Sequence, residues 1–505
     1  MFDAFFGSLG SVLEPGTILL LLAGVAVGFV VGILPGLGGP VTLALMLPFT
    51  FHMQPIEAFA FLLGMLVVTS TTGDLTSVLF GIPGEATTAA AALDGYPMTK
   101  RGESGRALGA VLFSSLLGSI LGAAVLAAAV PFIRPVVLAL GPPEFFVLTL
   151  LGLTFVITLS GGQILKGFLM AAAGLLVALI GVDSQAGVPR YTFDELYLWD
   201  GINLIPLVIG LFGGAELLQL MLSRKAIAGD LPDAPGKVSG VGRGVRDTLQ
   251  HWKVVIRSSS IGVLVGMIPG LGGSVAQFIA YGQAKQSSKN PEMFGKGAID
   301  GLIASGANNN ARDSGSLIPT IAFGIPGGAN TAVLLSAFLI VGLNPGPEML
   351  TDNVDVTFSM VWITVIANAI AVAVAFAVLK PLRKLTFISG PLLVPFLLML
   401  MALGAYSATN SWGDIFVMLA AAAIGVACIR WNWPRIPFLL AVVLGGLAER
   451  YLFLSHSLFG WDWLTRPAVL GLAALTALIL FAPLLRRVRS GRRNRSRNND
   501  EVMVP

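Results

Sequence analysis

Charged residues are scarce in this sequence. They make up 11% of the 505 residues, whereas a typical soluble domain has about 25%. Hydrophobic residues make up 55% and apolar runs fill most of the chain, so a water-soluble globule is excluded. One membrane crossing takes about 20 apolar residues. We therefore expect an all-α polytopic integral membrane protein with roughly 11–13 membrane segments.

Cysteine and histidine are almost absent as well. The one cysteine, Cys428, excludes an intramolecular disulfide and a cysteine metal site. The three histidines, His52, His251 and His456, lack the spacing of metal ligands. The sequence has no GxxxxGK(S/T) phosphate loop, which excludes an ATP motor of that kind. We expect no cofactor, and no metal other than Na⁺ as a candidate coupling ion.

Internal repeats divide the chain into two halves. The run GILPGLGG at 32–39 recurs as GMIPGLGG at 266–273, and FGIPGEATTA at 80–89 recurs as FGIPGGANTA at 323–332. The pattern predicts six segments: 1–15, an outer N-terminus; 16–222, the first repeat; 223–253, a cytoplasmic basic linker; 254–452, the second repeat; 453–485, an outer loop and an extra transmembrane helix; and 486–505, a cytoplasmic arginine-rich tail.

Loop charges predict that the two halves have opposite orientations. Lys and Arg mark the cytoplasmic side, and the loop at 100–106 is basic whereas its counterpart at 348–355 is acidic. Two further pairs change sign in the same way: 183–200 with 430–435, and Lys166 with 407–414. We therefore expect two inverted-topology repeats with discontinuous or re-entrant helices, as in secondary transporters. The basic tail is interpreted as a cytoplasmic anchor and not as a nucleic-acid arm, and the N-terminus is expected to be periplasmic.

The glycine-proline breaks predict an anion site. Irregular backbone at membrane depth is tolerated only where protein or a water-filled cavity satisfies it, and a helix that starts there offers free N–H groups. Ser274 is expected to be an N-cap, and Glu85 and Gly328 are expected to open the helices after each GIPG. Close helix packing alone is disfavoured because each motif occurs twice. The candidate substrate ligands are Gly36, Gly38, Gly39, Gly84, Glu85, Thr87, Thr88, Gly270, Gly272, Gly273, Ser274, Gly327, Gly328, Asn330 and Thr331.

Polar residues near the breaks are candidate coupling-ion ligands, because ionisable groups inside a membrane are costly and a hard cation prefers oxygen. The candidates are Asp74, Asn308, Asn309, Asn310 and Asp313. Three alternatives stay open at this point. Asp313 could simply pair with Arg312. Asp74 and Asp313 could be the carboxylates of an intramembrane aspartyl hydrolase, and a passive anion channel is the third interpretation.

Several motifs occur together in this chain: PGLGG at 35–39 and 269–273, GIPG at 81–84 and 324–327, LDGYPM at 93–98, and ANNNA at 307–311. In this combination the sequence resembles the large permease subunit of the tripartite tricarboxylate transporter family, over roughly residues 15–485. The resemblance implies a transporter and not an enzyme.

The resemblance also implies a mode of transport and a set of partners. The chain would be the permease of a secondary active symport system that imports tri- or dicarboxylates such as citrate across a bacterial inner membrane. Uptake would be coupled to a sodium or proton gradient. The implied partners are a small membrane subunit of about four helices and a periplasmic solute-binding protein.

Overall fold

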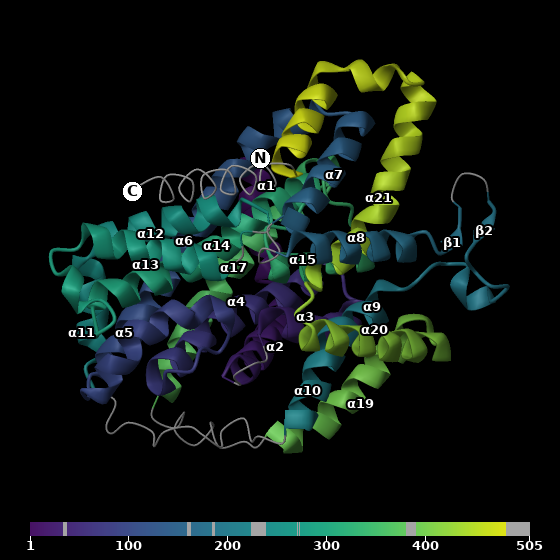
Figure 1. Cartoon of the computed structure of the whole chain (residues 1–505). Helices are drawn as coiled ribbons and strands as arrows, with labels where there is room; N and C mark the ends of the chain where they lie inside the picture. Colours follow the sequence, from purple (N-terminus) through teal and green to yellow (C-terminus); the bar gives the residue numbers. More distant parts are fainter. Residues whose placement is uncertain are drawn as a thin grey trace, which may run out of the picture. The chain divides into compact units, whose positions relative to one another are not determined.

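The protein is almost entirely helical over the residues that the computed structural model describes, as the sequence predicts (Figure 1). These residues are 1–33, 38–158, 163–183, 187–223, 239–269, 271, 273–379 and 390–480. The strands among them form one short antiparallel pair, β1 (Gly181–Val182) and β2 (Pro189–Arg190).

The first half holds the helices α1 (Phe2–Val12), α2 (Pro15–Gly32), α3 (Gly39–Met46), η1 (Leu47–Thr50), α4 (Pro55–Phe80), η2 (Ala86–Thr88), α5 (Ala89–Lys100), α6 (Ser104–Leu138), α7 (Pro142–Thr158), α8 (Ile164–Ala178), η3 (Leu196–Leu198), α9 (Leu204–Val208), the π-helix η4 (Ile209–Gly214) and α10 (Ala215–Ser223). The connection to the second half contains α11 (Val241–Gln250). The predicted basic linker at 223–253 is thus partly helical.

The second half holds α12 (Trp252–Gly266), α13 (Gly273–Ser287), η5 (Pro291–Met293), α14 (Ile299–Phe323), α15 (Ala329–Ile340), α16 (Pro347–Leu350), α17 (Val354–Val378), α19 (Gly390–Thr409), α20 (Trp412–Arg430), α21 (Ile436–Phe459), η6 (Asp462–Thr465) and a last helix, Pro467–Leu480. The order of the first half recurs in it, with α2, α3, α4 and α6 matched by α12, α13, α14 and α17. The arginine-rich tail at 486–505 lies outside the described residues.

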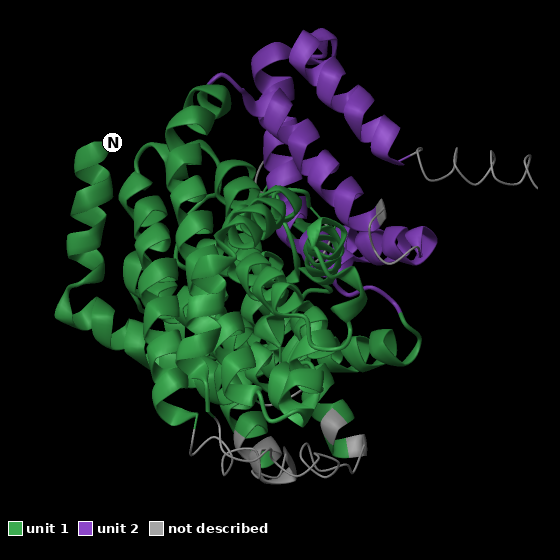
Figure 2. Ribbon diagram, turned by 90° about the vertical axis from the view of Figure 1, so that its left-hand side faces the viewer, with its two compact units in different colours: residues 1–138, 180–432 green, residues 139–179, 433–505 purple. Residues whose placement is uncertain are grey.

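The described helices fall into two compact units (Figure 2). Unit 1 comprises Met1–Leu138 and Ile180–Asn432, and unit 2 comprises Ala139–Leu179 and the chain from Trp433 onward. Unit 2 therefore combines α7 and α8 of the first half with α21 of the second. The division of the fold does not follow the division of the sequence into halves.

Two long helices, α4 and α14, form the centre of unit 1. In the most apolar 18-residue stretch of α4, 89% of the residues are buried, and all residues of α14 from Gly301 to Ala322 are buried. At 1.5 Å per residue, a helix of 25 residues is about 38 Å long, enough to cross a bilayer core. Because protein surrounds both helices, they can carry polar residues that a lipid-facing helix could not.

Each central helix ends at the first glycine of a GIPG motif. Gly81 and Gly324 follow α4 and α14 with φ of 70° and 67°, the left-handed conformation that glycine adopts without steric cost. The proline two residues later cannot continue a helix. The repeated motif thus stops two matching helices in the same way.

The packing of the halves is reciprocal. In unit 1, α6 of the first half packs on α14 of the second, and α17 of the second half packs on α4 of the first. Also in unit 1, α20 packs on α9 and η4, while in unit 2 α21 packs on α7 and α8. Each half therefore supplies the neighbours that the other half needs.

Six of the described helices are long and apolar enough to span a membrane: α2, α4, α6, α17, α20 and α21. Shorter apolar helices accompany them, among them the stretches at 39–50, 329–340 and 467–480. These features identify an all-α polytopic membrane protein. The polar central helix α14 does not belong to the six, because its residues are shielded by protein rather than selected for lipid.

Candidate substrate and ion site

The two PGLGG motifs each lead into a helix. The α3 helix starts at Gly39, with Gly38 as its N-cap, and α13 starts at Gly273. The expectation that Ser274 caps α13 is therefore wrong, since Ser274 already lies within the helix. The first N–H groups of a helix need hydrogen-bond acceptors. A glycine at the helix start has no side chain that could accept from them, so an acceptor must come from another segment or from a ligand. The candidates Gly36, Gly270 and Gly272 lie outside the described residues.

The start of α3 is occupied by a side chain of the same half. The backbone N–H of Gly39 donates to Oε2 of Glu85 at 3.2 Å, and the hydroxyl of Thr87 donates to the other carboxylate oxygen, Oε1. A carboxylate at a helix N-terminus is electrostatically favourable. Glu85 thus provides the α3 helix with an anion from within the chain.

Each helix start also meets the other half. A Cβ added at Gly39 would lie 2.7 Å from Oδ1 of Asn330. A Cβ added at Gly273 would collide with the methyl group of Thr87 and with the guanidinium of Arg312. Thr87 and Asn330 are at equivalent places in the two GIPG motifs. The structure therefore brings both PGLGG helices together with both segments that follow GIPG.

The segments that follow the two GIPG motifs, η2 and α15, start with the same hydrogen bond. The N–H groups of Glu85 and Gly328 donate to the hydroxyls of Thr88 at 3.4 Å and Thr331 at 3.0 Å, so both threonines act in capping. Glu85 and Gly328 are the N-caps of η2 and α15, which confirms the sequence prediction that they open these helices.

The last glycine of each GIPG allows two segments to approach closely. A Cβ at Gly84 would lie 2.6 Å from the Cα of Gly73, and one at Gly327 would lie 2.5 Å from the Cβ of Ser316. Cβ atoms are not found at such distances from backbone or from other Cβ atoms. A larger residue at either position would push the segment after GIPG away from its central helix.

The three consecutive asparagines of α14 point in three directions. The amide of Asn308 donates to the carbonyl of Ser258 on α12 at 3.2 Å. Asn310 donates to Ser115 on α6 at 2.7 Å, and also to Thr71 on α4. Since neighbours on a helix are about 100° apart, the run cannot act as one ligand set. Asn308 and Asn310 tie α14 to its neighbours, which leaves Asn309 near the ion candidate on α4.

Asp74 and Asn309 meet between the central helices. Nδ2 of Asn309 donates to Oδ2 of Asp74 at 3.3 Å and to the carbonyl of Ser70 at 3.0 Å. Both side chains are fully buried. Among the described residues, Oδ1 of Asp74 and Oδ1 of Asn309 have no hydrogen-bond partner, and the same holds for Oδ1 of Asn308 and of Asn310. Buried oxygens without a partner are uncommon, and the two of the hydrogen-bonded pair Asp74 and Asn309 are suitable ligands for a hard cation.

Asp313 is held by a different set of groups. Arg312 donates from Nη2 to Oδ1 of Asp313 at 2.6 Å, and Ser70 donates to Oδ2 at 3.3 Å. The pairing that the sequence left open is thus present. Arg312 is not among the site residues predicted from the sequence. Its charge, within a polar run next to the repeated motifs, would have indicated a functional residue. Arg312 is 6% exposed and reaches the start of α13.

The two aspartates are bonded to different partners. An aspartyl hydrolase needs two carboxylates about 3 Å apart that share a proton. Asp74 is bonded to Asn309, and Asp313 is bonded to Arg312 and Ser70. The hydrogen bonds of the described residues include none between the two carboxylates, so the arrangement does not favour a hydrolase. The same residues also contain no group of three or more His, Cys, Asp or Glu that could hold a metal.

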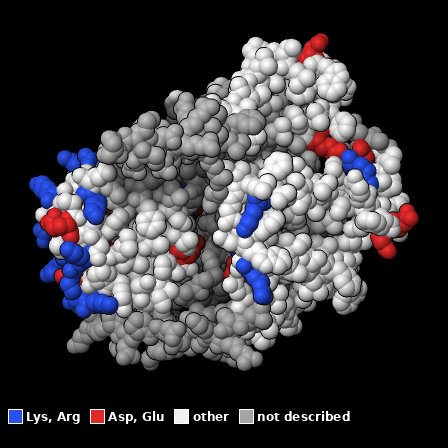
Figure 3. Space-filling view, viewed as in Figure 1, with Lys and Arg blue, Asp and Glu red and all other residues white. Residues whose placement is uncertain are grey.

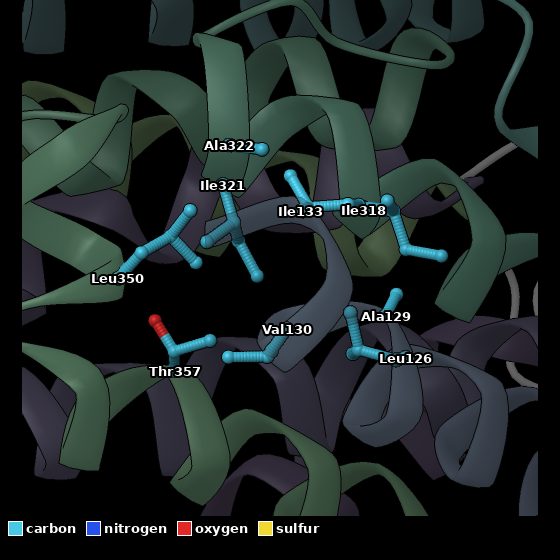
Figure 4. A pocket seen from close by; sticks show the side chains of 9 residues that line it. All are labelled: Leu126, Ala129, Val130, Ile133, Ile318, Ile321, Ala322, Leu350 and Thr357. Carbon is cyan, nitrogen blue, oxygen red and sulfur yellow. The ribbon is translucent and has the colours of Figure 1, made fainter. Parts of the chain in front are cut away.

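A separate cavity in unit 1 differs in chemistry. It is lined by α6, α14, α16 and α17, with Leu126, Ile133 and Ile321 among its residues (Figure 4). The one hydroxyl in its wall, from Thr357, donates to the carbonyl of Met349 at 2.6 Å. The cavity offers no group for a carboxylate, so the polar site of the molecule lies elsewhere.

The helices and the buried polar site define a polytopic membrane protein in which two halves contribute broken helices to one polar centre. Residues 18–440 match the model of the tripartite tricarboxylate transporter TctA family. The chain belongs to this family and is a membrane permease of that transporter type, which implies partner subunits.

Two relatives from Agrobacterium vitis are similar to the chain. One is an uncharacterized 52.8 kDa protein in the TAR-I ttuC' 3' region, 32% identical over 489 residues, which are 95% of each chain. The other is an uncharacterized protein in the TAR-II ttuC' 3' region, 30% identical over 234 residues, which are 46% of this chain and 97% of the relative. No solved structure is significantly similar to the chain.

Proposed function

We propose that the chain is the permease of a secondary active transporter that imports tri- or dicarboxylates, driven by a sodium or proton gradient. It would work in a bacterial inner membrane with a small membrane subunit of about four helices and a periplasmic solute-binding protein. It would catalyse no chemical reaction. The family supports the transport of carboxylates and the need for partner subunits.

One observation carries the proposal: each PGLGG helix start meets the segment after GIPG of the other half, at Gly39 with Asn330 and at Gly273 with Thr87. Discontinuous helices that converge from two repeats hold the substrate in transporters of this kind. The substrate carboxylates would bind in the region where these helix starts and segments meet. A passive channel would not need two such paired breaks.

The coupling ion is proposed to bind between α4 and α14. Asp74 supplies a carboxylate and Asn309 an amide oxygen, and both have an oxygen atom without a partner in the described chain. Of the five residues predicted as ion ligands, these two are joined to each other by a hydrogen bond between α4 and α14, and their oxygens have the chemistry that Na⁺ prefers. The other three would stabilise the site through hydrogen bonds to neighbouring residues: Asn308 to Ser258, Asn310 to Ser115, and Asp313 to Arg312.

The proposal includes an inverted arrangement of the two halves. Lys and Arg gather at the end of unit 1 that carries α11 (Figure 3), among them Arg243 and Arg246 on α11 and Lys253 on α12, so this end would face the cytoplasm. Cysteines introduced at Lys100 and at Glu348 should react with an impermeant thiol reagent from opposite sides of the membrane. Labelling of both from one side would contradict the inversion.

Uptake by proteoliposomes tests the function directly. The full chain is reconstituted with its small subunit, binding protein is added outside, and uptake of radiolabelled citrate is measured with and without a sodium gradient. We expect gradient-dependent uptake by the wild type and loss of the sodium dependence in Asp74→Asn. Asp355→Asn removes an exposed carboxylate and should behave as the wild type. Equal sodium dependence in both variants would refute the assignment of Asp74.

A further inference from the structure

The two halves differ at one residue that the repeat aligns. FGIPGE in the first half corresponds to FGIPGG in the second, so Gly328 stands in the position of Glu85. The two residues have similar roles in the backbone, because each is an N-cap with an extended conformation. The difference between them is therefore the presence or absence of a carboxylate.

In the first half this carboxylate neutralises a helix start. Glu85 accepts from the N–H of Gly39, the first residue of α3, at 3.2 Å and is also bonded to Thr87. In the second half the matching place contains no side chain. A Cβ added at Gly328 has no heavy atom within 4 Å among the described residues, so no described side chain takes the place that the Glu85 carboxylate has in the first half.

The start of α13 is bordered by positive charge. Arg312 lies against Gly273, the first residue of α13, where the helix carries about half a positive charge. Its Nη2 is bonded to Asp313, and its Nη1 is the atom that a Cβ at Gly273 would meet first. Asp313 thus pairs one nitrogen of this buried guanidinium, and the guanidinium and the helix start together favour a further anion.

We propose that one carboxylate of the substrate binds at the start of α13, between its N–H groups and Arg312, in the place that the Glu85 carboxylate occupies at α3. The site then has one anion subsite and not two, because Glu85 closes the other. The inference rests on the proposed function for the identity of the anion as a transported carboxylate. Arg312 is assigned as a substrate-binding residue.

The test places a carboxylate in the open position. Gly328→Glu is compatible with the backbone, since φ is −165° and ψ is −175°, and Gly328→Gln is its uncharged match. Each full-length variant is purified in detergent, and thermal unfolding is measured alone, with citrate and with sulfate at the same concentration. Citrate affinity is measured by calorimetry, and Arg312→Gln and the double variant Gly328→Glu/Arg312→Gln complete the set.

We expect Gly328→Glu to raise the unfolding midpoint above that of Gly328→Gln, and we expect this gain to disappear in the double variant. Both Gly328→Glu and Arg312→Gln should weaken citrate binding at least about tenfold, the effect of one hydrogen bond to a charged group. Equal midpoints for the Glu and Gln variants, or wild-type citrate affinity in Arg312→Gln, would overturn the subsite.

The outcomes also separate this inference from the proposed function. If the wild type binds no citrate but Gly328→Glu is stabilised through Arg312, the anion subsite stands and citrate is not its ligand. If sulfate stabilises the wild type as much as citrate does, the site binds anions in general and the assignment to carboxylates is refuted.

Discussion

Replacement of Asp94 by alanine is expected to destabilise the permease by about 3–9 kcal/mol. Asp94 is fully buried on α5. Its Oδ1 accepts from the N–H groups of Gly295 and Gly297, both at 2.8 Å, and of Ala298 at 2.9 Å, and its Oδ2 accepts from the hydroxyl of Tyr281 at 2.9 Å. This one carboxylate therefore fixes the loop that joins α13 to α14.

The magnitude follows from the burial of each donor. Ala298 and Tyr281 are buried, and an unpaired buried donor costs about 1–3 kcal/mol. Gly295 and Gly297 are accessible to water, so their bonds contribute about 0.5–1.5 kcal/mol each. Asp94→Asn retains an acceptor oxygen and should lose less, and Tyr281→Phe should lose about the contribution of one bond.

The assay is thermal unfolding of the purified full chain in detergent. Asp94→Ala should lower the midpoint by several degrees, whereas Asp352→Ala, which removes an exposed carboxylate, should leave it unchanged. The effects of Asp94→Ala and Tyr281→Phe should not be additive, because the two residues share a hydrogen bond. An Asp94→Ala midpoint within about one degree of the wild type would refute the reasoning.

Two further predictions concern the site and the end of unit 1 that carries α11. Gly39→Val should abolish uptake without preventing membrane insertion, because the added side chain would meet Asn330. The control is Gly282→Ala, which should retain uptake because its added Cβ has no heavy atom within 4 Å among the described residues. Normal uptake by Gly39→Val would contradict the site. The hydrogen bond with Asp300 raises the pKa of His251 above 6.5, so this contact should stabilise the protein below pH 6.5 and lose its effect as the pH rises through the higher folded-state pKa. Unfolding midpoints across this range should show that slope in the wild type, and its persistence in His251→Gln would refute the assignment.

Much of the fold was accessible from the sequence because its signals are local. Composition indicates a membrane protein, and the doubled GIPG motif predicts the helix ends at Gly81 and Gly324, since glycine and proline act on their own segment. Ser274 shows the limit of such signals: a preference for N-caps does not fix the first residue of a helix to within one position.

The organisation of the site was less accessible because it depends on contacts between distant segments. A run of asparagines looks like one ligand set in the sequence, but helical geometry sends Asn308 and Asn310 to different neighbours. The position of Arg312 against the start of α13 requires the packing of α12 and α13 on α14. No local pattern encodes either result.

The reciprocal packing has a consequence for the origin of this architecture. The last helices of each half have their neighbours in the other half: α21 packs on α7 and α8, and α20 packs on α9 and η4. A precursor made of a single half would have left these apolar faces uncovered, unless a second copy supplied them. Gene duplication and fusion would then have joined the subunits of a helix-exchanging homodimer, and the difference between Glu85 and Gly328 is the kind of asymmetry that only a fused pair can acquire.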